Sequence, residues 1–287
     1  EPEGRGVHCF VVPIRDDDGT DLPGVATSDC GYKGGLAGVD NGRILFDNVR
    51  IPAENLLNKY GDVAADGTYS SPIESTNKRF FTMLGTLIRG RVCVAATAGA
   101  AGRKALTLAT RYGLLRKQFE APDEQGEVTI LDYLGHQRKL LPLIAKSYAI
   151  AFAQNDITAR LAEGDPEAAR TLEADVAGFK AYSTWHGSTA VNIAREACGG
   201  AGYLSENQLP IIRGDIDVFT TFEGDNTVLT QLIGKELLGA YAEDMRGLSA
   251  RGWVRFIATM ARDVVAEKTA VRQVIDRKST RLNSSHL

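Results

Sequence analysis

The sequence predicts a mostly α-helical protein with a β segment at its start, in which the helices form an antiparallel four-helix bundle. Two observations lead to this fold class. Apolar and β-branched runs separated by turn residues fill roughly the first 65 positions. From about residue 74, apolar residues recur at spacings of three and four, and only short connections interrupt them.

The β segment contains two candidate strands, VHCFVVPI at 7–14 and GRILFDNVRIP at 42–52, with a turn-rich loop after the first. One or two hairpins cannot hold a hydrophobic core by themselves. We therefore expect partner strands upstream of residue 1, which makes the chain part of a longer protein.

Four long helices follow in order, at about 74–115, 130–163 and 168–197 and then directly after Glu223. Glycines spaced along the first helix lower its helix propensity but allow neighbouring helices to approach closely. The apolar spacing in the second helix predicts an inner face made of Leu140, Leu141, Ile144, Tyr148 and Phe152.

These patterns divide the chain into four parts. Residues 1–65 are the end of a β domain, and residues 74–241 are the helical bundle. Residues 242–276 begin a linker or a second helical domain. The polar, aperiodic segment 277–287 is interpreted as a non-native tail and is excluded from the fold prediction.

Composition excludes several classes of protein. The 287 residues are 44% hydrophobic and 24% charged with a net charge of −3, which is typical of a globular protein and disfavours nucleic acid as a partner. No apolar run reaches the length of a membrane span. The four cysteines and four histidines show no ligand spacing, so we expect no metal site and reduced, intracellular thiols.

Two motifs are candidates for binding a ligand. Arg111, Arg116 and Lys117 in RYGLLRKQFE could grip a phosphate, or could simply complement the C-terminal end of a helix dipole. Gly199 and Gly200 in CGGAGY could lie flat against a large planar ligand, or could only end a helix. Physical reasoning alone leaves both alternatives open.

Glu223 in FEGDNTV is the candidate catalytic residue. It stands in an apolar run just before a helix, where a carboxylate would be a cap residue favoured by the helix dipole or a buried base. Asp225, Asn226 and Thr227 can all cap that helix, which leaves Glu223 free for another role.

The motifs occur in an order that resembles the acyl-CoA dehydrogenase and oxidase superfamily. NVRIPAENLLN, RKQF, CGGAGY and FEGDNTV follow one another over roughly residues 5–240. GVHCFVVPIRD and DYLGHQRKLLPLIA resemble the acyl-CoA oxidase branch in particular. The resemblance implies that the β segment is the remainder of a barrel-like middle domain and that the chain is truncated at both ends.

The resemblance also implies roles for single residues. Glu223 would be the catalytic base. Arg116, with Gln118 and Phe119 beside it, would contact the pyrophosphate of an FAD held by a neighbouring subunit. Gly199 and Gly200 would lie along the adenosine of FAD, and Asp225 would touch flavin phosphate or ribose. One departure concerns Glu120, which stands where relatives have a glycine after RxQF.

The function implied is FAD-dependent α,β-desaturation of fatty acyl-CoA with O₂ as acceptor, giving H₂O₂, in a homodimer or higher homo-oligomer. One alternative is an acyl-CoA dehydrogenase that passes electrons to an electron-transferring flavoprotein. Another is an inactive helical fragment that serves oligomerisation or acyl-CoA binding. Composition favours a bacterial cytoplasm, and a eukaryotic source would imply the peroxisome.

Overall fold

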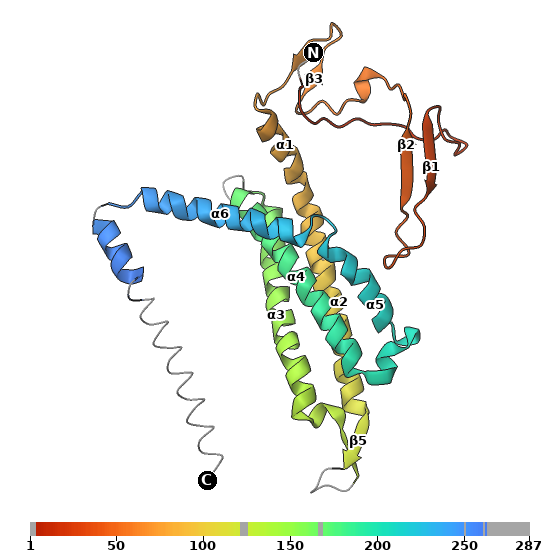
Figure 1. The fold of residues 1–287 in the computed structure, drawn as a ribbon, viewed down its shortest axis with the longest axis vertical. Coiled ribbons are helices and arrows are strands. Elements are labelled where there is room, and N and C mark those ends of the chain that lie inside the picture. Colours follow the sequence, from red (N-terminus) through yellow and green to blue (C-terminus); the bar gives the residue numbers. More distant parts are fainter. Residues whose placement is uncertain (1–3, 121–125, 166–168, 250, 261, 263–287) are drawn as a thin grey trace. The chain divides into compact units, whose positions relative to one another are not determined.

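The computed structural model describes residues 4–120, 126–165, 169–249, 251–260 and 262. The residues up to Ile233 form one compact unit, and those from Gly234 form a second. The described residues are mostly helical and contain three small antiparallel sheets of two strands each. Figure 1 shows β1, β2 and β3 before the long helices and β5 beyond the end of α2.

The β segment is less regular than the sequence predicts. Strand β1 (Val25–Asp29) pairs with β2 (Gly42–Phe46), and β3 (Asp62–Val63) pairs with β4 (Tyr69–Ser70). The strand predicted at 7–14 is wrong, because that segment makes only one isolated bridge, at Phe10. The predicted 42–52 strand ends at Phe46. Strand β2 ends where its pairing with β1 ends, and residues 7–14 have no ladder of backbone partners.

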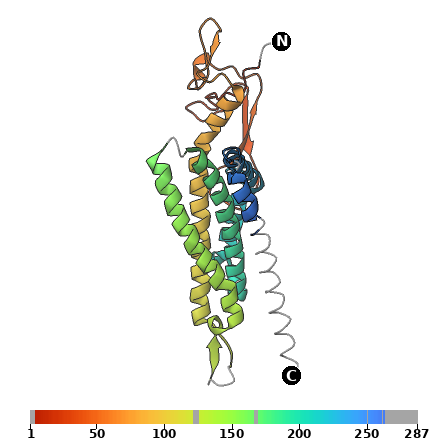
Figure 2. The same cartoon turned by 90° about the vertical axis from the view of Figure 1, so that its left-hand side faces the viewer.

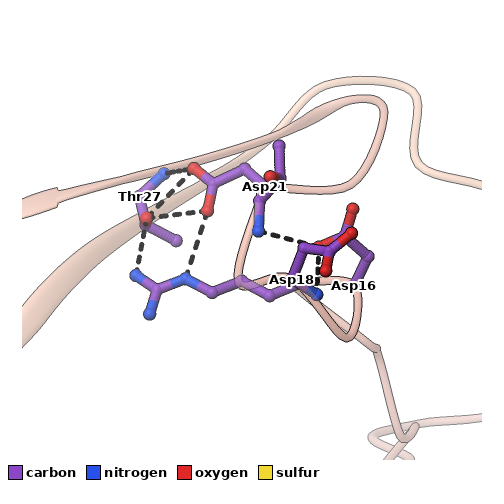
Figure 3. A network of polar contacts seen from close by, with 6 residues as sticks. Asp16, Asp18, Asp21 and Thr27 are labelled. Carbon is purple, nitrogen blue, oxygen red and sulfur yellow. Dashed lines mark hydrogen bonds and ion pairs between the residues drawn. The ribbon is translucent and has the colours of Figure 1, made fainter.

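Side chains hold the loop between Arg15 and Thr27, most of which lies in the predicted turn-rich segment (Figure 3). Asp21 accepts hydrogen bonds from the Thr27 backbone N–H at 2.6 Å and from Nε of Arg15 at 3.3 Å. These bonds, the Thr27 backbone bond first, lower the pKa of the Asp21 carboxyl. Asp16 closes the adjoining turn by accepting from the N–H of Thr20 at 2.8 Å. Local polar contacts therefore fix the conformation of the loop before β1.

The first predicted helix consists of two helices. Helix α1 (Thr76–Leu84) starts at Ser75, whose Oγ accepts a bond from the Lys78 N–H at 3.3 Å. A single 3-10 turn, η2 (Gly85–Leu87), separates it from α2 (Ile88–Leu115). Glycine is a poor helix former, which accounts for the break at Gly85.

Helices α2, α3 (Leu134–Glu163) and α4 (Ala169–Ala197) pack side by side, as both views show (Figures 1 and 2). Small residues allow α2 and α4 to approach closely, as the sequence predicts. A Cβ placed on Gly187 would lie 2.8 Å from the carbonyl oxygen of Ala98, and one on Gly102 would lie 3.5 Å from the Cβ of Ala190. The core runs along this contact through Ala98, Leu106, Ala190 and Val191.

The fourth helix packed against α2 and α4 is α5 (Leu209–Asp217), which is much shorter than the other three. Helix α6 (Asn226–Arg246) follows Glu223, as predicted, and its first turns contact α4 through Asn226 and Ile233. Of the four long helices predicted to form a bundle, three (α2, α3 and α4) pack against one another.

The residues predicted to form the inner face of α3 are only partly the ones that are buried. Leu140 is fully buried and Ile144 packs against the core. Leu141, Tyr148 and Phe152 are instead more than half exposed, and the inward positions belong to Ser147, Ile150 and Ile157. A periodic pattern with apolar residues on two sides does not reveal which side is buried within one chain.

The stretch Thr76–Leu115 is long and apolar enough to cross a membrane by length and composition alone. Core helices of soluble proteins pass the same test, and α2 contacts both α3 and α4 along the core. This stretch was not predicted from the sequence as a candidate membrane span. The expected absence of a membrane span therefore remains a prediction.

In the second compact unit, residues 251–260 are helical. The ring of Phe256 lies 6.1 Å from the rings of both Tyr241 and Trp253. Most of the predicted 242–276 segment beyond this point, and the whole 277–287 tail, lie outside the described residues. The four domain boundaries therefore remain predictions.

Candidate active site

Glu223 lies in the turn between the 3-10 turn η6 (Val218–Thr220) and α6. Its φ of +53° is in the left-handed region, which side chains rarely adopt and which is found repeatedly at functional sites. A Cβ placed on Gly90 of α2 would lie 2.6 Å from the Glu223 carboxyl carbon and 2.7 Å from each oxygen. The half-buried carboxylate therefore lies directly against the backbone of α2, and only glycine at 90 leaves it room.

The apolar surroundings of Glu223 are incomplete. Phe219 is buried in the core, but Phe222 and Val228 are 45% and 59% exposed. Among the described residues, one side of the turn therefore faces solvent. A water-poor pocket around Glu223 would require a substrate or another polypeptide to cover that side.

Asp225 caps α6. Its Oδ1 accepts a hydrogen bond from the Thr227 N–H at 2.8 Å and another from the Val228 N–H at 3.3 Å. The helix start is thus satisfied by Asp225, which leaves Glu223 free of a capping role. The structure does not place Asp225 with the other residues predicted to bind the cofactor, and its contact with FAD remains a prediction.

Sequence reasoning missed a buried lysine beneath this turn. Lys180 of α4 is fully buried, and its Nζ donates to the carbonyl oxygens of Gly224 at 2.6 Å and Thr220 at 3.5 Å. It also donates to Oδ1 of Asn226 at 2.9 Å. Burial, as the largest cause, lowers the pKa of Lys180 to about 8. The signal was available, because Lys180 falls four residues after Val176 on the buried face of α4.

A cleft of about 470 Å³ lies at the other end of α2. It brings together five of the six residues predicted to bind the cofactor: Arg116, Gln118, Phe119, Gly199 and Gly200. Arg116 ends α2, and Gln118 and Phe119 follow in β5 (Lys117–Glu120). The glycines begin the 3-10 turn η4 (Gly199–Tyr203) directly after α4. Residues 116–119 and 199–200, which are 80 to 84 positions apart in the sequence, therefore line one cleft.

The cleft offers hydrogen-bonding groups that the described residues do not use. Nε2 of His136 is buried and has no hydrogen-bond partner among them, and burial, followed by the charge of Lys139, lowers the pKa of this imidazole. The ring is therefore neutral near pH 7. Arg116 supplies a guanidinium suited to phosphate oxygens. Tyr133 lines the same cleft and donates its hydroxyl to the Gln118 carbonyl at 2.6 Å, which braces β5.

The backbone of the cleft is open where the glycines lie. A Cβ placed on Gly199 or Gly200 would meet nothing within 4 Å, and the φ of Gly199 is +54°. Flat backbone of this kind can lie against a large planar group. Glu120 does not line the cleft and pairs opposite Glu127 in β6 (Glu127–Thr129). The donors and the open backbone fit a nucleotide cofactor with a pyrophosphate.

A second cleft of about 560 Å³ adjoins the first, because Tyr112 and Cys198 line both. Burial raises the pKa of the Cys198 thiol, so this side chain is neutral. Lys104 and Gln208 line the second cleft and are joined by a 2.8 Å hydrogen bond. Both clefts include Cys198, which directly follows α4.

Glu223 and the cleft lie at opposite ends of α2. Gly90, against which the carboxylate lies, and Arg116 are separated by nearly the whole 28-residue helix. At 1.5 Å per residue this separation is about 38 Å. One chain therefore cannot bring its own Glu223 to a reacting group held near its own Arg116.

Sequence reasoning also missed Tyr133 and His136 of the cleft. Both lie in DYLGHQRKL, a run that the sequence analysis used only for resemblance. No signal in the sequence places this run opposite Gly199. Within the described ranges, no three His, Cys, Asp or Glu side chains are grouped so that they could hold a metal ion.

Comparison of this sequence with known proteins shows similarity to the acyl-CoA oxidases. A family described as "Acyl-CoA oxidase, C-alpha1 domain" matches residues 84–238, more than half of the chain. Acyl-coenzyme A oxidase 2, peroxisomal, of Arabidopsis thaliana is 47% identical over 247 residues, which cover 84% of this chain and 36% of that protein. Peroxisomal acyl-coenzyme A oxidase 3 of Homo sapiens is 38% identical over 254 residues, covering 84% and 36%.

Solved structures give the same result. Acyl-CoA oxidase 3 from Yarrowia lipolytica matches with a TM-score of 0.74 and 35% identity, over 83% of this chain and 36% of that one. Acyl-CoA oxidase-1 of Caenorhabditis elegans, solved in complex with FAD and ATP, matches with a TM-score of 0.73 and 30% identity, over 85% and 37%. The chain spans about a third of the length of the relatives it matches.

Proposed function

Because this chain belongs to the acyl-CoA oxidase family, we propose that it forms part of an enzyme that desaturates fatty acyl-CoA to trans-2-enoyl-CoA. FAD is the cofactor and O₂ is the electron acceptor, so that H₂O₂ is released, in fatty acid β-oxidation. The observation that carries the proposal is the cleft, in which Arg116, Gln118, Phe119, Gly199 and Gly200 lie together.

In the proposed reaction Glu223 is the general base. Its carboxylate takes the proton from Cα of the acyl thioester as the Cα–Cβ double bond forms. The chemistry that bound FAD supplies is acceptance of the hydride from Cβ and delivery of the electrons to O₂. The turn at Glu223 contributes position, because Lys180 binds its backbone and the carboxylate lies against Gly90 of α2 before substrate arrives.

The cleft residues have a separate task. Arg116 would grip the pyrophosphate of FAD with charge-assisted hydrogen bonds, and His136 would donate to or accept from the same group or the ribose. Gly199 and Gly200 would admit the adenosine against bare backbone. Asp225, whose Oδ1 caps α6, would present its other oxygen to the flavin side chain.

We propose that the enzyme is a homodimer or a higher homo-oligomer. The distance of about 38 Å along α2 separates the base from the pyrophosphate site of the same chain. A second copy that places its own Arg116 near the first copy's FAD would complete the site. The exposed α3 side chains Tyr148 and Phe152 agree with a face that another polypeptide covers.

The whole protein would complete the fold in a similar way. Additional strands would turn β1–β4 into the remainder of a barrel-like middle domain over residues 1–65. Residues 74–241 would complete the four-helix bundle with α6, and residues 242–276 would lead into a second helical domain. The named relatives from Arabidopsis thaliana and Homo sapiens are peroxisomal proteins, which favours the peroxisome over a bacterial cytoplasm for this chain.

The test uses a full-length acyl-CoA oxidase that carries this chain in place of its own matching segment. Reduction by an acyl-CoA without air, followed by admission of air, should give rapid reoxidation and one equivalent of H₂O₂. Glu223→Gln should keep bound FAD and lose almost all reduction. Slow reoxidation would favour the dehydrogenase, and loss of FAD binding in the unmodified protein would favour the inactive helical fragment.

A further inference from the structure

We infer that Lys180 is a positioning residue for the catalytic base: it fastens the turn that carries Glu223 to α4. The inference rests on the proposed function of Glu223, but the contacts that lead to it belong to the described residues alone. Lys180 is one of only two charged side chains in the described core that are 2% exposed or less. Buried charges are rare unless they are paired or used.

The contacts of Lys180 are concentrated on one turn. Its Nζ reaches the carbonyl oxygens of Thr220 and Gly224, which bracket Glu223 on either side, and the side chain of Asn226 at the first position of α6. An ammonium group has three donors, and all three are directed at residues 220–226. The group therefore ties together both ends of the segment that holds the base.

Asn226 extends this connection into α4. The side chain is 2% exposed, and while Oδ1 accepts from Lys180, its Nδ2 donates to Oγ1 of Thr184 at 2.9 Å and to the Ala181 carbonyl at 3.4 Å. Thr184 in turn donates to the Lys180 carbonyl at 2.9 Å. The turn is thus joined to one face of α4 through a closed set of buried hydrogen bonds, which rigidifies both.

The need for such a fastening follows from the backbone. Glu223 has φ +53° and Gly224 has φ +104°, and a non-glycine residue in the left-handed region persists only where its surroundings hold it. The Glu223 carboxylate lies against Gly90 of α2, in space that a Cβ at residue 90 would occupy. Lys180 from α4 and the backbone of α2 therefore hold the turn between two long helices.

The charged groups around Lys180 agree with this role. Asp225 and Glu223 on the turn raise its pKa, Arg91 of α2 lowers it, and burial lowers it most. The pKa of about 8 that results keeps the ammonium charged near pH 7. A neutral apolar residue would avoid the desolvation of a charge, so stability does not explain a lysine at this position.

The test compares Lys180→Met with Lys146→Met in the full-length oxidase carrying this chain. Methionine keeps the straight side chain and removes the three donors, whereas Lys146 is exposed on α3. For Lys180→Met we expect normal FAD content, a KM within about threefold and a rate of flavin reduction lowered roughly 10- to 100-fold, because small displacements of a base have effects of this size. Lys146→Met should be unchanged. Unchanged reduction in a folded, flavin-loaded Lys180→Met protein would overturn the inference.

Two further measurements keep the result decisive. Hydrogen–deuterium exchange on this 287-residue chain should accelerate at residues 218–229 in Lys180→Met and stay constant along α3. If protection at residues 218–229 were the same in Lys180→Met as in the unmodified chain, Lys180 would not fasten the turn. That result would overturn the inference even if the proposed oxidase activity were absent. If Lys180→Met does not fold, Asn226→Ala removes one acceptor and leaves the bond to Gly224, and a rate of reduction within twofold of normal in that protein would count equally against the inference.

Discussion

Gly90→Ala should separate the stability of this protein from its catalysis. The added Cβ would lie 2.6 Å from the carboxyl carbon of Glu223, whereas ordinary contacts begin near 3.4 Å. The carboxylate must therefore move by at least about 0.8 Å, and it can do so because it ends a flexible side chain. The fold should tolerate the change, since alanine in place of glycine stabilises a helix by up to about 1 kcal/mol.

Catalysis should not tolerate it. A displacement of this size at a reacting group lowers a rate by roughly 100-fold. The assay is single-turnover reduction of flavin by an acyl-CoA without air, in a full-length oxidase carrying this chain, with urea unfolding of the same protein. Gly85→Ala is the matched control, because a Cβ there would meet nothing within 4 Å.

The result that would refute this reasoning is a Gly90→Ala enzyme that reduces its flavin within about twofold of the normal rate. A double-mutant cycle adds a second check. Glu223→Asp shortens the side chain by one methylene and withdraws the carboxylate from position 90. Residues in contact show coupled effects, so the double variant should lose less activity than the two single losses combined.

Three other perturbations test the remaining parts of the site. Arg116→Ala should lower FAD retention about 10-fold or more while Arg111→Ala leaves it unchanged, measured as flavin content after gel filtration, because a charged hydrogen bond is lost only in the first. Gly202→Ala should destabilise the fold by roughly 2 kcal/mol or more in urea unfolding, because its Cβ would lie 2.0 Å from the Arg195 carbonyl oxygen, which is backbone and cannot turn away. Between the folded pKa of about 8 and the ordinary 10.5, an unfolded chain keeps a proton on Lys180 that the folded chain has lost, so stability from this group rises with pH. The unfolding free energy of the unmodified chain relative to Lys180→Met should therefore increase by about 2 kcal/mol from pH 7 to about pH 9.5, and a flat difference would contradict the burial of a charged amine.

Two features of the fold show why prediction from sequence was more accurate for helices than for strands. The long helices α3 and α4 begin and end within a few residues of their predicted bounds, because hydrogen bonds within a helix depend on local sequence. Residues 7–14 have the composition of a strand but form only an isolated bridge at Phe10, because a strand requires a partner and composition does not supply one.

The residues predicted for the cofactor illustrate the same limit at the site. Arg116 and Gly199 were identified by motif, and their common cleft depends on α2 and α4 ending side by side, which no local pattern states. Lys180 was not identified at all. Its importance arises from Thr220 and Gly224, residues 40 and more positions away, whose carbonyl groups have no sequence signature.

The sequence by itself determined the helices, the motifs in their order and the candidate base Glu223, because residue types and short spacings carry that information. Only the tertiary structure decided that Gly90 and Lys180 hold Glu223 from two sides, and that the base and the Arg116 cleft lie at opposite ends of one helix. The physical reason is that a helix of 28 residues is rigid and about 42 Å long. Residues at its two ends therefore serve different sites, although their motifs belong to the same family pattern.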